Sequence, residues 1–362
     1  MCSTRHSMFC ILPPYILRAI AERGSPEQRA TASQTLALDL TLRTLRSTPL
    51  AIEAHSLADI VADPAVKQRT IYTANHQQQL PGTVVASEAK PPASNADVAV
   101  REAFDGLGAT WDFYAQVFDR QSIDDQGMAL NATVHYGNRY NNAFWNGRQM
   151  VFGDGDGQLF NRFTIALDVI GHELTHGVTQ DEAGLIYMFQ AGALNESLSD
   201  VFGSLIKQRK NRQTARKADW LIGEGLFTAA VHGQALRSMK APGTAYSDPV
   251  LGDDPQPGHM SKYVNTYEDN GGVHINSGIP NRAFYLASYA FDGYAWEKAG
   301  RIWYETLRDA ALRPNTGFTR FARLTVATAG RLYGQGSVEQ DIVSDAWATV
   351  GLPVSSGTTV AQ

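Results

Sequence analysis

The chain has 362 residues, a hydrophobic content of 43%, a charged content of 19% and a formal net charge of −5. This length exceeds one ordinary hydrophobic core, so two lobes with an additional segment are expected. No apolar run approaches the roughly 18 residues of a membrane span, and no basic patch interleaved with aromatic residues indicates a nucleic-acid partner.

The first fifty residues form a basic leader that holds both cysteines, Cys2 and Cys10. Six arginines against three acidic residues give the leader a net charge of +3. Because the whole chain has a net charge of −5, the remaining residues have a net charge of −8. Opposite charge would let the leader dock on the body, although small charge differences between segments are common. No adequate apolar stretch precedes Pro13, so a Sec-type signal peptide is not predicted. We expect secretion by a non-Sec route, or otherwise a cytoplasmic location.

The leader is expected to form two short helices. Isoleucines and leucines recur at helical spacing over residues 14–46, and Gly24-Ser-Pro26 interrupts them. Residues 47–70 have mixed composition, with Pro49 and Pro64, and are interpreted as a cleavable linker.

Strands are predicted first and helices later along the rest of the chain. Alternating residues predict strands at 70–72, 82–85, 131–136, 143–145 and 149–152, with a helix over 97–118 between them. Further helices are predicted at 193–210, 278–292, 299–312, 318–333 and 338–349. This order favours an α+β fold with a leader and linker over 1–66, a β-rich lobe over 67–180 and an α-helical lobe over 181–362. A central helix between the two lobes would place a functional site in the cleft between them.

That central helix carries the sequence His172-Glu-Leu-Thr-His176. Positions i and i+4 share one helix face, so His172 and His176 can bind one metal ion. Glu196, on a second helix, can supply a third ligand. Two imidazoles and one carboxylate leave Zn²⁺ an open fourth position, where a bound water has a pKa of about 7 and Glu173 can take its proton.

The surroundings strengthen the prediction of a zinc site. Phe163, Leu167, Ile170 and Leu174 place an apolar stripe before and through the motif, as expected of a helix buried on one face. The second helix has neighbouring polar residues on the Glu196 face that could accept the spare N–H groups of metal-bound imidazoles.

Four motifs in order resemble the thermolysin family of metalloproteases. In chain order they are Asn141 to Gly147, the stretch 172–187, Gly192 to Asp200 and Asp269 to Gly278. Pro13-Pro14-Tyr15 and the short leader look like the protealysin-type branch, whose precursors carry a propeptide.

The resemblance implies a role for each matching residue. It implies that His172, His176 and Glu196 bind zinc, that Glu173 is the general base, and that Asn195 and Asp200 hold the imidazoles. Tyr187 and His274 would stabilise the oxyanion, with Asp269 orienting His274. The residues implied to contact substrate are Asn142, Ala143, Trp145 and Arg237 along the peptide, and Phe160, Phe163, Val169, Ile222 and Leu236 around an apolar pocket.

The leader is expected to inhibit the enzyme. A stiff Pro13-Pro14 segment followed by Tyr15 could occupy the substrate cleft without being cut. The Cys10 thiolate could also take the open zinc position, or Cys10 could be a small apolar packing residue.

Calcium binding is doubtful in this chain. The family holds two calcium ions in a carboxylate cluster that Asp168, Asp219 and Glu224 match here, but Lys207 stands where a glutamate would be. We expect the Lys207 ammonium to replace the ion, the alternative being an exposed lysine at a helix end.

The sequence therefore predicts a zinc endopeptidase, made as a self-processed precursor, that cuts peptides and proteins before bulky apolar residues. A non-catalytic zinc protein that binds peptides is a second hypothesis, but it predicts a missing base or missing oxyanion donors. An aminopeptidase would need a carboxylate for the free amine, and none is evident near Asn142.

Overall fold

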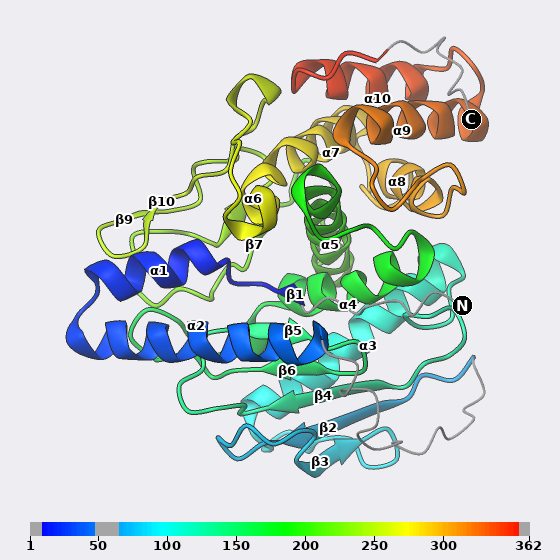
Figure 1. The fold of residues 1–362 in the computed structure, drawn as a ribbon. Coiled ribbons are helices and arrows are strands. Elements are labelled where there is room, and N and C mark those ends of the chain that lie inside the picture. Colours follow the sequence, from blue (N-terminus) through cyan, green and yellow to red (C-terminus); the bar gives the residue numbers. More distant parts are fainter. Residues whose placement is uncertain (1–8, 48–64, 355–362) are drawn as a thin grey trace. The chain divides into compact units, whose positions relative to one another are not determined.

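A computed structural model describes residues 9–47 and 65–354 (Figure 1). The chain forms two compact units. Unit 1 comprises residues 1–177, 225–232 and 248–252, and unit 2 comprises residues 178–224, 233–247 and 253–362. Cys2 and most of the expected linker, residues 48–64, lie outside the described residues.

Unit 1 is organised around a six-stranded sheet. Its strands lie in the order β1-β5-β6-β4-β2-β3. The middle strands β6, β4 and β2 are parallel to one another, whereas β1 and β3 at the edges pair antiparallel. The strands are β1 (Phe9–Cys10), β2 (Arg69–Thr73), β3 (Thr83–Ser87), β4 (Leu130–Val134), β5 (Ala143–Trp145) and β6 (Met150–Phe152). The sheet thus receives one edge strand, β1, from the leader.

Helix α3 (Val98–Phe118) packs on this sheet against β2 and β4. Asp97 caps its N-terminus, because one carboxylate oxygen accepts hydrogen bonds from the N–H groups of Ala99 and Val100 at 2.8 and 3.3 Å. Its buried residues recur at helical spacing, as the sequence predicts.

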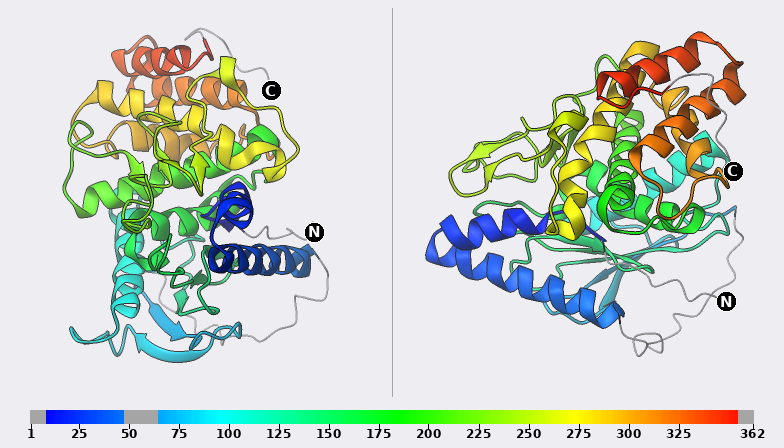
Figure 2. Two further views of the ribbon diagram at one scale, coloured as in Figure 1. Left: turned by 90° about the vertical axis from the view of Figure 1, so that its left-hand side faces the viewer. Right: turned by 45° about the horizontal axis from the view of Figure 1, so that its top comes forward.

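The leader forms a pair of helices, α1 (Pro14–Arg23) and α2 (Pro26–Ser47), packed side by side (Figure 2). Each begins with a proline, which suits a first helical turn because the N–H there has no intrahelical partner. The second helix, with 22 residues, is longer than expected. The paired helices keep Ile16, Leu17 and Ile20 buried.

The zinc-motif helix is α4 (Leu167–Glu182), preceded by the short 3-10 helix η2 (Phe163–Ile165). Unit 2 is mainly helical, and α10 packs against α7 and α9. Its helices are α5 (Phe189–Lys210), η3 (Met260–Lys262), α6 (Asp269–Asn276), α7 (Gly278–Phe291), α8 (Ala299–Leu307), α9 (Phe318–Tyr333) and α10 (Val338–Thr349). Four short strands, β7 (Leu221–Ile222), β8 (Arg237–Ser238), β9 (Ser247–Asp248) and β10 (Gly252–Asp253), complete the elements.

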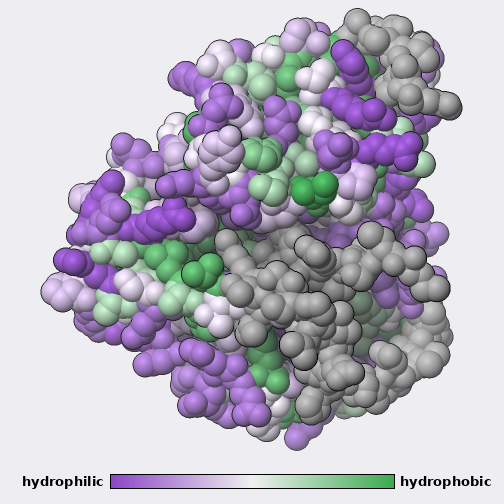
Figure 3. Space-filling view, in the orientation of Figure 1, coloured by the Kyte–Doolittle hydropathy of each residue, from purple (hydrophilic) through white to green (hydrophobic). Residues whose placement is uncertain are grey.

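Among the coloured residues of Figure 3, hydrophilic ones predominate, and smaller groups of hydrophobic residues lie between them. Within the part of the chain that the structure describes, none of the helices has the length and apolar character needed to span a bilayer.

Candidate active site

The two histidines of α4 point their ring nitrogens at one another. His172 and His176 are fully buried, and their Nε2 atoms lie 3.0 Å apart. A zinc ion bound at about 2.0–2.1 Å by two imidazoles in tetrahedral geometry holds the two nitrogens roughly 3.3 Å apart. The pair therefore fits two ligands of a single zinc ion.

Glu173 is also fully buried, and its direction is fixed by the neighbouring sheet. Oε2 of Glu173 accepts a hydrogen bond of 3.0 Å from the main-chain N–H of Trp145 in β5. A strand amide that holds one carboxylate oxygen orients the whole group, as a positioned base requires.

Helix α5 carries Glu196, which is buried and accepts a hydrogen bond from the Tyr187 hydroxyl. His172, His176 and Glu196 together form a buried group that could hold one metal ion. Two imidazoles and a carboxylate are a ligand set that suits zinc.

His274 lies beside both Tyr187 and Glu196. Its Nε2 is 3.2 Å from the Tyr187 hydroxyl and 3.5 Å from Glu196 Oε2, and its Nδ1 is 2.6 Å from Asp269 Oδ1. Burial alone lowers the pKa of His274, but the charges of Asp269 and Glu196 and the Asp269 hydrogen bond outweigh it, so the pKa is raised. With Nδ1 beside Asp269, Nε2 is the ring nitrogen that faces the Tyr187 hydroxyl and Glu196.

The turn before His274 depends on glycine. Gly271 and Gly272 have φ angles of +84° and +75°, in the left-handed region. A Cβ on Gly271 would lie 2.4 Å from the ring of Phe189. The Asp269 carboxylate also accepts the main-chain N–H of His274 at 2.9 Å, which closes the turn.

Asp200 and Arg237 are brought together, a pairing that the sequence did not reveal. The buried guanidinium donates to both Asp200 oxygens at 2.8 Å, and Asn281 Nδ2 donates to Oδ2 at 2.8 Å. Asn281 was missed because only its burial, which the sequence does not show, distinguishes it. Asn195 Nδ2 lies 3.5 Å from the carbonyl oxygen of Leu185.

Asn142, expected to hold a peptide main chain, binds the leader. Its Oδ1 accepts the main-chain N–H of Leu12 at 3.0 Å, and its Nδ2 donates to Asp39 Oδ2 at 2.9 Å. The next residue, Ala143, accepts the N–H of Ile11 at 3.2 Å through its carbonyl oxygen. The leader therefore runs as a strand beside β5. Asp39 was not identified from the sequence.

The start of the leader differs from the expected inhibitory segment. Pro13 is extended, with φ −63° and ψ 143°, but Pro14 is the first residue of α1, so the expectation of a stiff, extended Pro13-Pro14 segment is wrong at Pro14. Proline at the first helical position favours this start. Cys10 is buried in an apolar cluster with Tyr136, Tyr140, Phe144 and Val151 among others, and the group of candidate zinc ligands does not include it.

The residues expected around an apolar pocket are all almost fully buried: Phe160, Phe163, Val169, Ile222 and Leu236. In unit 1 the rings of Phe160 and Phe163 lie 5.9 Å apart. In unit 2 the N–H of Leu236 donates to the Ile222 carbonyl oxygen at 2.9 Å.

Lys207 lies in the last turn of α5 and is largely buried. The alternative of an exposed lysine at a helix end is therefore wrong. Its ammonium donates to Asp219 Oδ1 at 2.9 Å and to the Leu221 carbonyl oxygen at 2.8 Å.

Fold and site define a metallopeptidase of the thermolysin class. A model of the thermolysin catalytic domain matches residues 41–180, a model of the thermolysin α-helical domain matches residues 183–352, and a model of the protealysin propeptide matches residues 10–37. The chain belongs to the thermolysin family of zinc-dependent metallopeptidases, in a precursor form with a propeptide. The expected α+β fold and enzyme class are confirmed.

Individual relatives agree with this assignment. An extracellular metalloprotease of Pectobacterium carotovorum subsp. carotovorum is 55% identical over 95% of this chain and 96% of its own. Thermolysin of Alicyclobacillus acidocaldarius subsp. acidocaldarius is 42% identical over 78% of this chain and 50% of its own. The structure resembles the precursor of protealysin, a metalloproteinase from Serratia proteamaculans, with a TM-score of 0.86 and 56% identity over 95% of this chain and 99% of that chain.

Proposed function

We propose that this protein is a zinc endopeptidase that removes its own leader and then cuts proteins before bulky hydrophobic residues. The observation that carries the proposal is the fixed carboxylate of Glu173 beside His172 in a buried site. A zinc ion held by His172, His176 and Glu196 would polarise the peptide carbonyl and acidify the attacking water.

Glu173 takes the proton from that water in this mechanism. The hydrogen bond from the Trp145 N–H holds Oε2 and so restricts the rotation of this carboxylate. Glu173 can then pass the proton to the departing amine, so one group serves as base and then as acid.

Tyr187 and His274 stabilise the negative charge that develops on the carbonyl oxygen. Asp269 keeps Nδ1 of His274 hydrogen-bonded, which directs any donation through Nε2, the atom beside the Tyr187 hydroxyl. Preorganised donors of this kind lower the barrier by about 3–4 kcal/mol each.

Asn142 and β5 hold the substrate as an added strand. The precursor supports this role, since Leu12 and Ile11 of the leader already use Asn142 Oδ1 and the Ala143 carbonyl oxygen. Strand addition satisfies the main chain of any peptide, so specificity must come from side-chain pockets. The apolar residues of unit 1 that include Phe160 and Phe163 supply the preference for a bulky hydrophobic residue after the cut bond.

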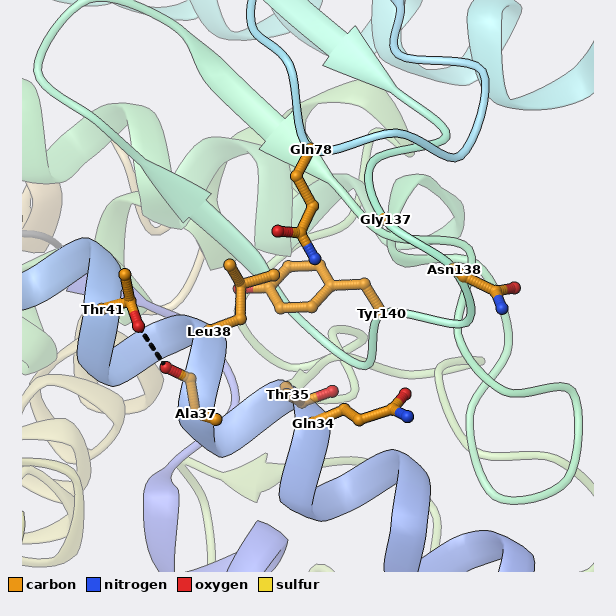
Figure 4. A pocket seen from close by; sticks show the side chains of 9 residues that line it. All are labelled: Gln34, Thr35, Ala37, Leu38, Thr41, Gln78, Gly137, Asn138 and Tyr140. Carbon is orange, nitrogen blue, oxygen red and sulfur yellow. Dashed lines mark hydrogen bonds between the residues drawn. The ribbon is translucent and has the colours of Figure 1, made fainter.

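The leader inhibits the enzyme by occupying this strand position. It is also anchored through α2, where Tyr140 and Asn142 both donate to Asp39. Figure 4 shows the pocket beside this anchor, lined by Leu38 and Thr41 of α2 and by Gln78 and Tyr140 of the body.

The relative in Pectobacterium carotovorum is named an extracellular protease, which supports an extracellular place of action here.

Cleavage-site mapping tests the proposed specificity. The matured enzyme is incubated with a denatured protein of known sequence, and the new N-termini are read by mass spectrometry. We expect leucine, isoleucine, phenylalanine or valine at most new N-termini. An equal distribution over charged and polar residues would contradict the proposed pocket.

A further inference from the structure

Three neighbouring parallel strands end in residues that can bind a metal, away from the catalytic motif. The strands β6, β4 and β2 lie next to one another and run in the same direction (Figure 1). His135 follows Val134 of β4 directly, Asp154 stands two residues after Phe152 of β6, and His76 stands three residues after Thr73 of β2. The carboxyl ends of parallel strands share one edge of a sheet, so two imidazoles and one carboxylate meet there.

The distances between these side chains suit the binding of one shared metal ion. Nδ1 of His135 lies 2.9 and 3.0 Å from the two oxygens of Asp154, and Nδ1 of His76 lies 3.3 Å from Asp154 Oδ2. In a tetrahedral site with bonds of about 2.1 Å, ligand atoms lie roughly 3.4 Å apart. The three residues form a group able to hold a metal ion.

The far side of the His135 ring has the partner that metal-bound histidines use. Its Nε2 lies 3.3 Å from Asp97 Oδ1, and the same oxygen is held by two N–H groups at the start of α3. A histidine that binds metal through one nitrogen commonly donates its other N–H to a carboxylate, which fixes ring and tautomer. Here Asp97 would leave the Nδ1 lone pair directed toward Asp154 and His76.

The main chain brings the two histidines together. The N–H of His76 donates to the carbonyl oxygen of His135 at 2.8 Å, and their rings lie 5.5 Å apart. The His76 side chain is 61% exposed, whereas those of His135 and Asp154 are 21% and 27% exposed. An ion could therefore enter from solvent and keep a water as its fourth ligand.

We propose that His76, His135 and Asp154 form a second metal site for Zn²⁺, with Asp97 orienting His135. The ion would join the segments that follow β2, β4 and β6 to the start of α3, and so stabilise unit 1. Binding to the folded state alone raises the melting temperature as the free ion concentration rises.

A competing interpretation is a protonated histidine between two carboxylates. Hydrogen bonding to Asp154, opposed by burial and assisted by the charges of Asp154 and Asp97, raises the pKa of His135. An imidazolium ion held in this way would explain the contacts of His135 without any metal. It would also repel a cation, so the two interpretations predict opposite results on adding zinc.

Zinc stoichiometry separates the two interpretations. The full chain, without a polyhistidine tag, is dialysed against micromolar free Zn²⁺ and the bound metal is counted by mass spectrometry. We expect two zinc ions per chain, and one in His76→Asn or Asp154→Asn. Asparagine at 76 is a mild change because it tolerates the left-handed backbone found there, with φ +60°. His232→Asn, at an exposed histidine outside the group, should keep two ions.

A second readout distinguishes this site from the catalytic one. With His172 and His176 both changed to alanine, the chain should still bind one zinc ion and gain thermal stability from it. With Co²⁺, that variant should show the visible absorption of a four-coordinate ion, and adding Asp154→Asn should abolish it. A wild-type stoichiometry of one, or a stoichiometry unchanged by both His76→Asn and Asp154→Asn, would overturn the proposal.

Discussion

The main-chain N–H of Leu12 donates a 3.0 Å hydrogen bond to the side chain of Asn142, across 130 residues of sequence. A residue of the leader thus binds the amide that we propose for holding substrate. The same amide donates to Asp39, so one side chain of the body is held at two points of the leader. Weakening either contact should release the leader from the strand position beside β5 that we propose for substrate.

Changing Asp39 to alanine should speed maturation. The substitution leaves the buried Tyr140 and Asn142 donors without their acceptor, which costs about 1–3 kcal/mol and weakens leader docking roughly five- to a hundredfold. The measurement is the lag before activity appears after the precursor is purified. Ser33→Ala, at an exposed position of α2, is the matched control. Unchanged lag times in Asp39→Ala would show that this anchor does not restrain the leader.

Acid should weaken the leader contact through Glu27. Hydrogen bonds from Arg139 and Gln158, and the charge of Arg139, lower the pKa of Glu27 in the docked leader. A carboxylate with a lowered pKa stabilises the docked state above its free pKa, and this contribution disappears as the pH falls through the lowered value.

The readout is hydrogen exchange of α2 in the inactive Glu173→Gln precursor, followed from neutral pH to below pH about 4, that is, to below the range of free carboxylates. Protection should fall with pH more in this protein than in the same protein with Glu27→Gln added. Identical pH profiles for the two proteins would argue against a contribution from Glu27.

Changing Tyr187 to phenylalanine should lower kcat by about 10²–10³-fold with little change in KM, because one oxyanion donor is lost while the ring stays. Zinc content should be unchanged, which separates this effect from damage to Glu196. Tyr267→Phe is the control, since that tyrosine is 91% exposed. If kcat stays within a few-fold of wild type, Tyr187 does not act on the oxyanion.

The Lys207 ammonium should make stability independent of calcium in this region. It already binds Asp219 and the Leu221 carbonyl oxygen, where an ion would need anionic oxygen ligands. We expect the wild-type melting temperature to be unchanged by millimolar Ca²⁺, in buffer that keeps zinc saturated. Lys207→Glu should melt lower without calcium and recover with it, whereas the exposed change Lys210→Glu should do neither. A large rise in the wild-type melting temperature with calcium would contradict the replacement.

Periodic patterns predicted most of the fold. The expected helix over 97–118 is α3 (Val98–Phe118), and the last two expected helices agree with α9 and α10. The expected helix over 299–312 ends earlier, at Leu307. The strand β1 could not be predicted, because two residues carry no periodicity and the strand exists only through pairing with β5.

The sequence could not predict those parts of the site that depend on contacts between distant residues. The spacing of His172 and His176 is local, so the helix alone dictates that they share a face. By contrast, Asp39 and Asn142 are 103 residues apart, and Asn281 and Asp200 are 81 apart, so only tertiary folding pairs them. His76, His135 and Asp154 were missed for the same reason, since the order of parallel strands brings them together.

The most direct test of the central claim compares wild-type protein with Glu173→Gln. Glutamine keeps the size of glutamate but cannot accept a proton, so zinc content should stay the same while casein hydrolysis falls by at least about 10²–10⁴-fold. The intact mass should show a leader removed from the wild type and retained in the variant. A Glu173→Gln protein that hydrolyses casein and loses its leader at the wild-type rate would contradict the proposed mechanism and self-processing together.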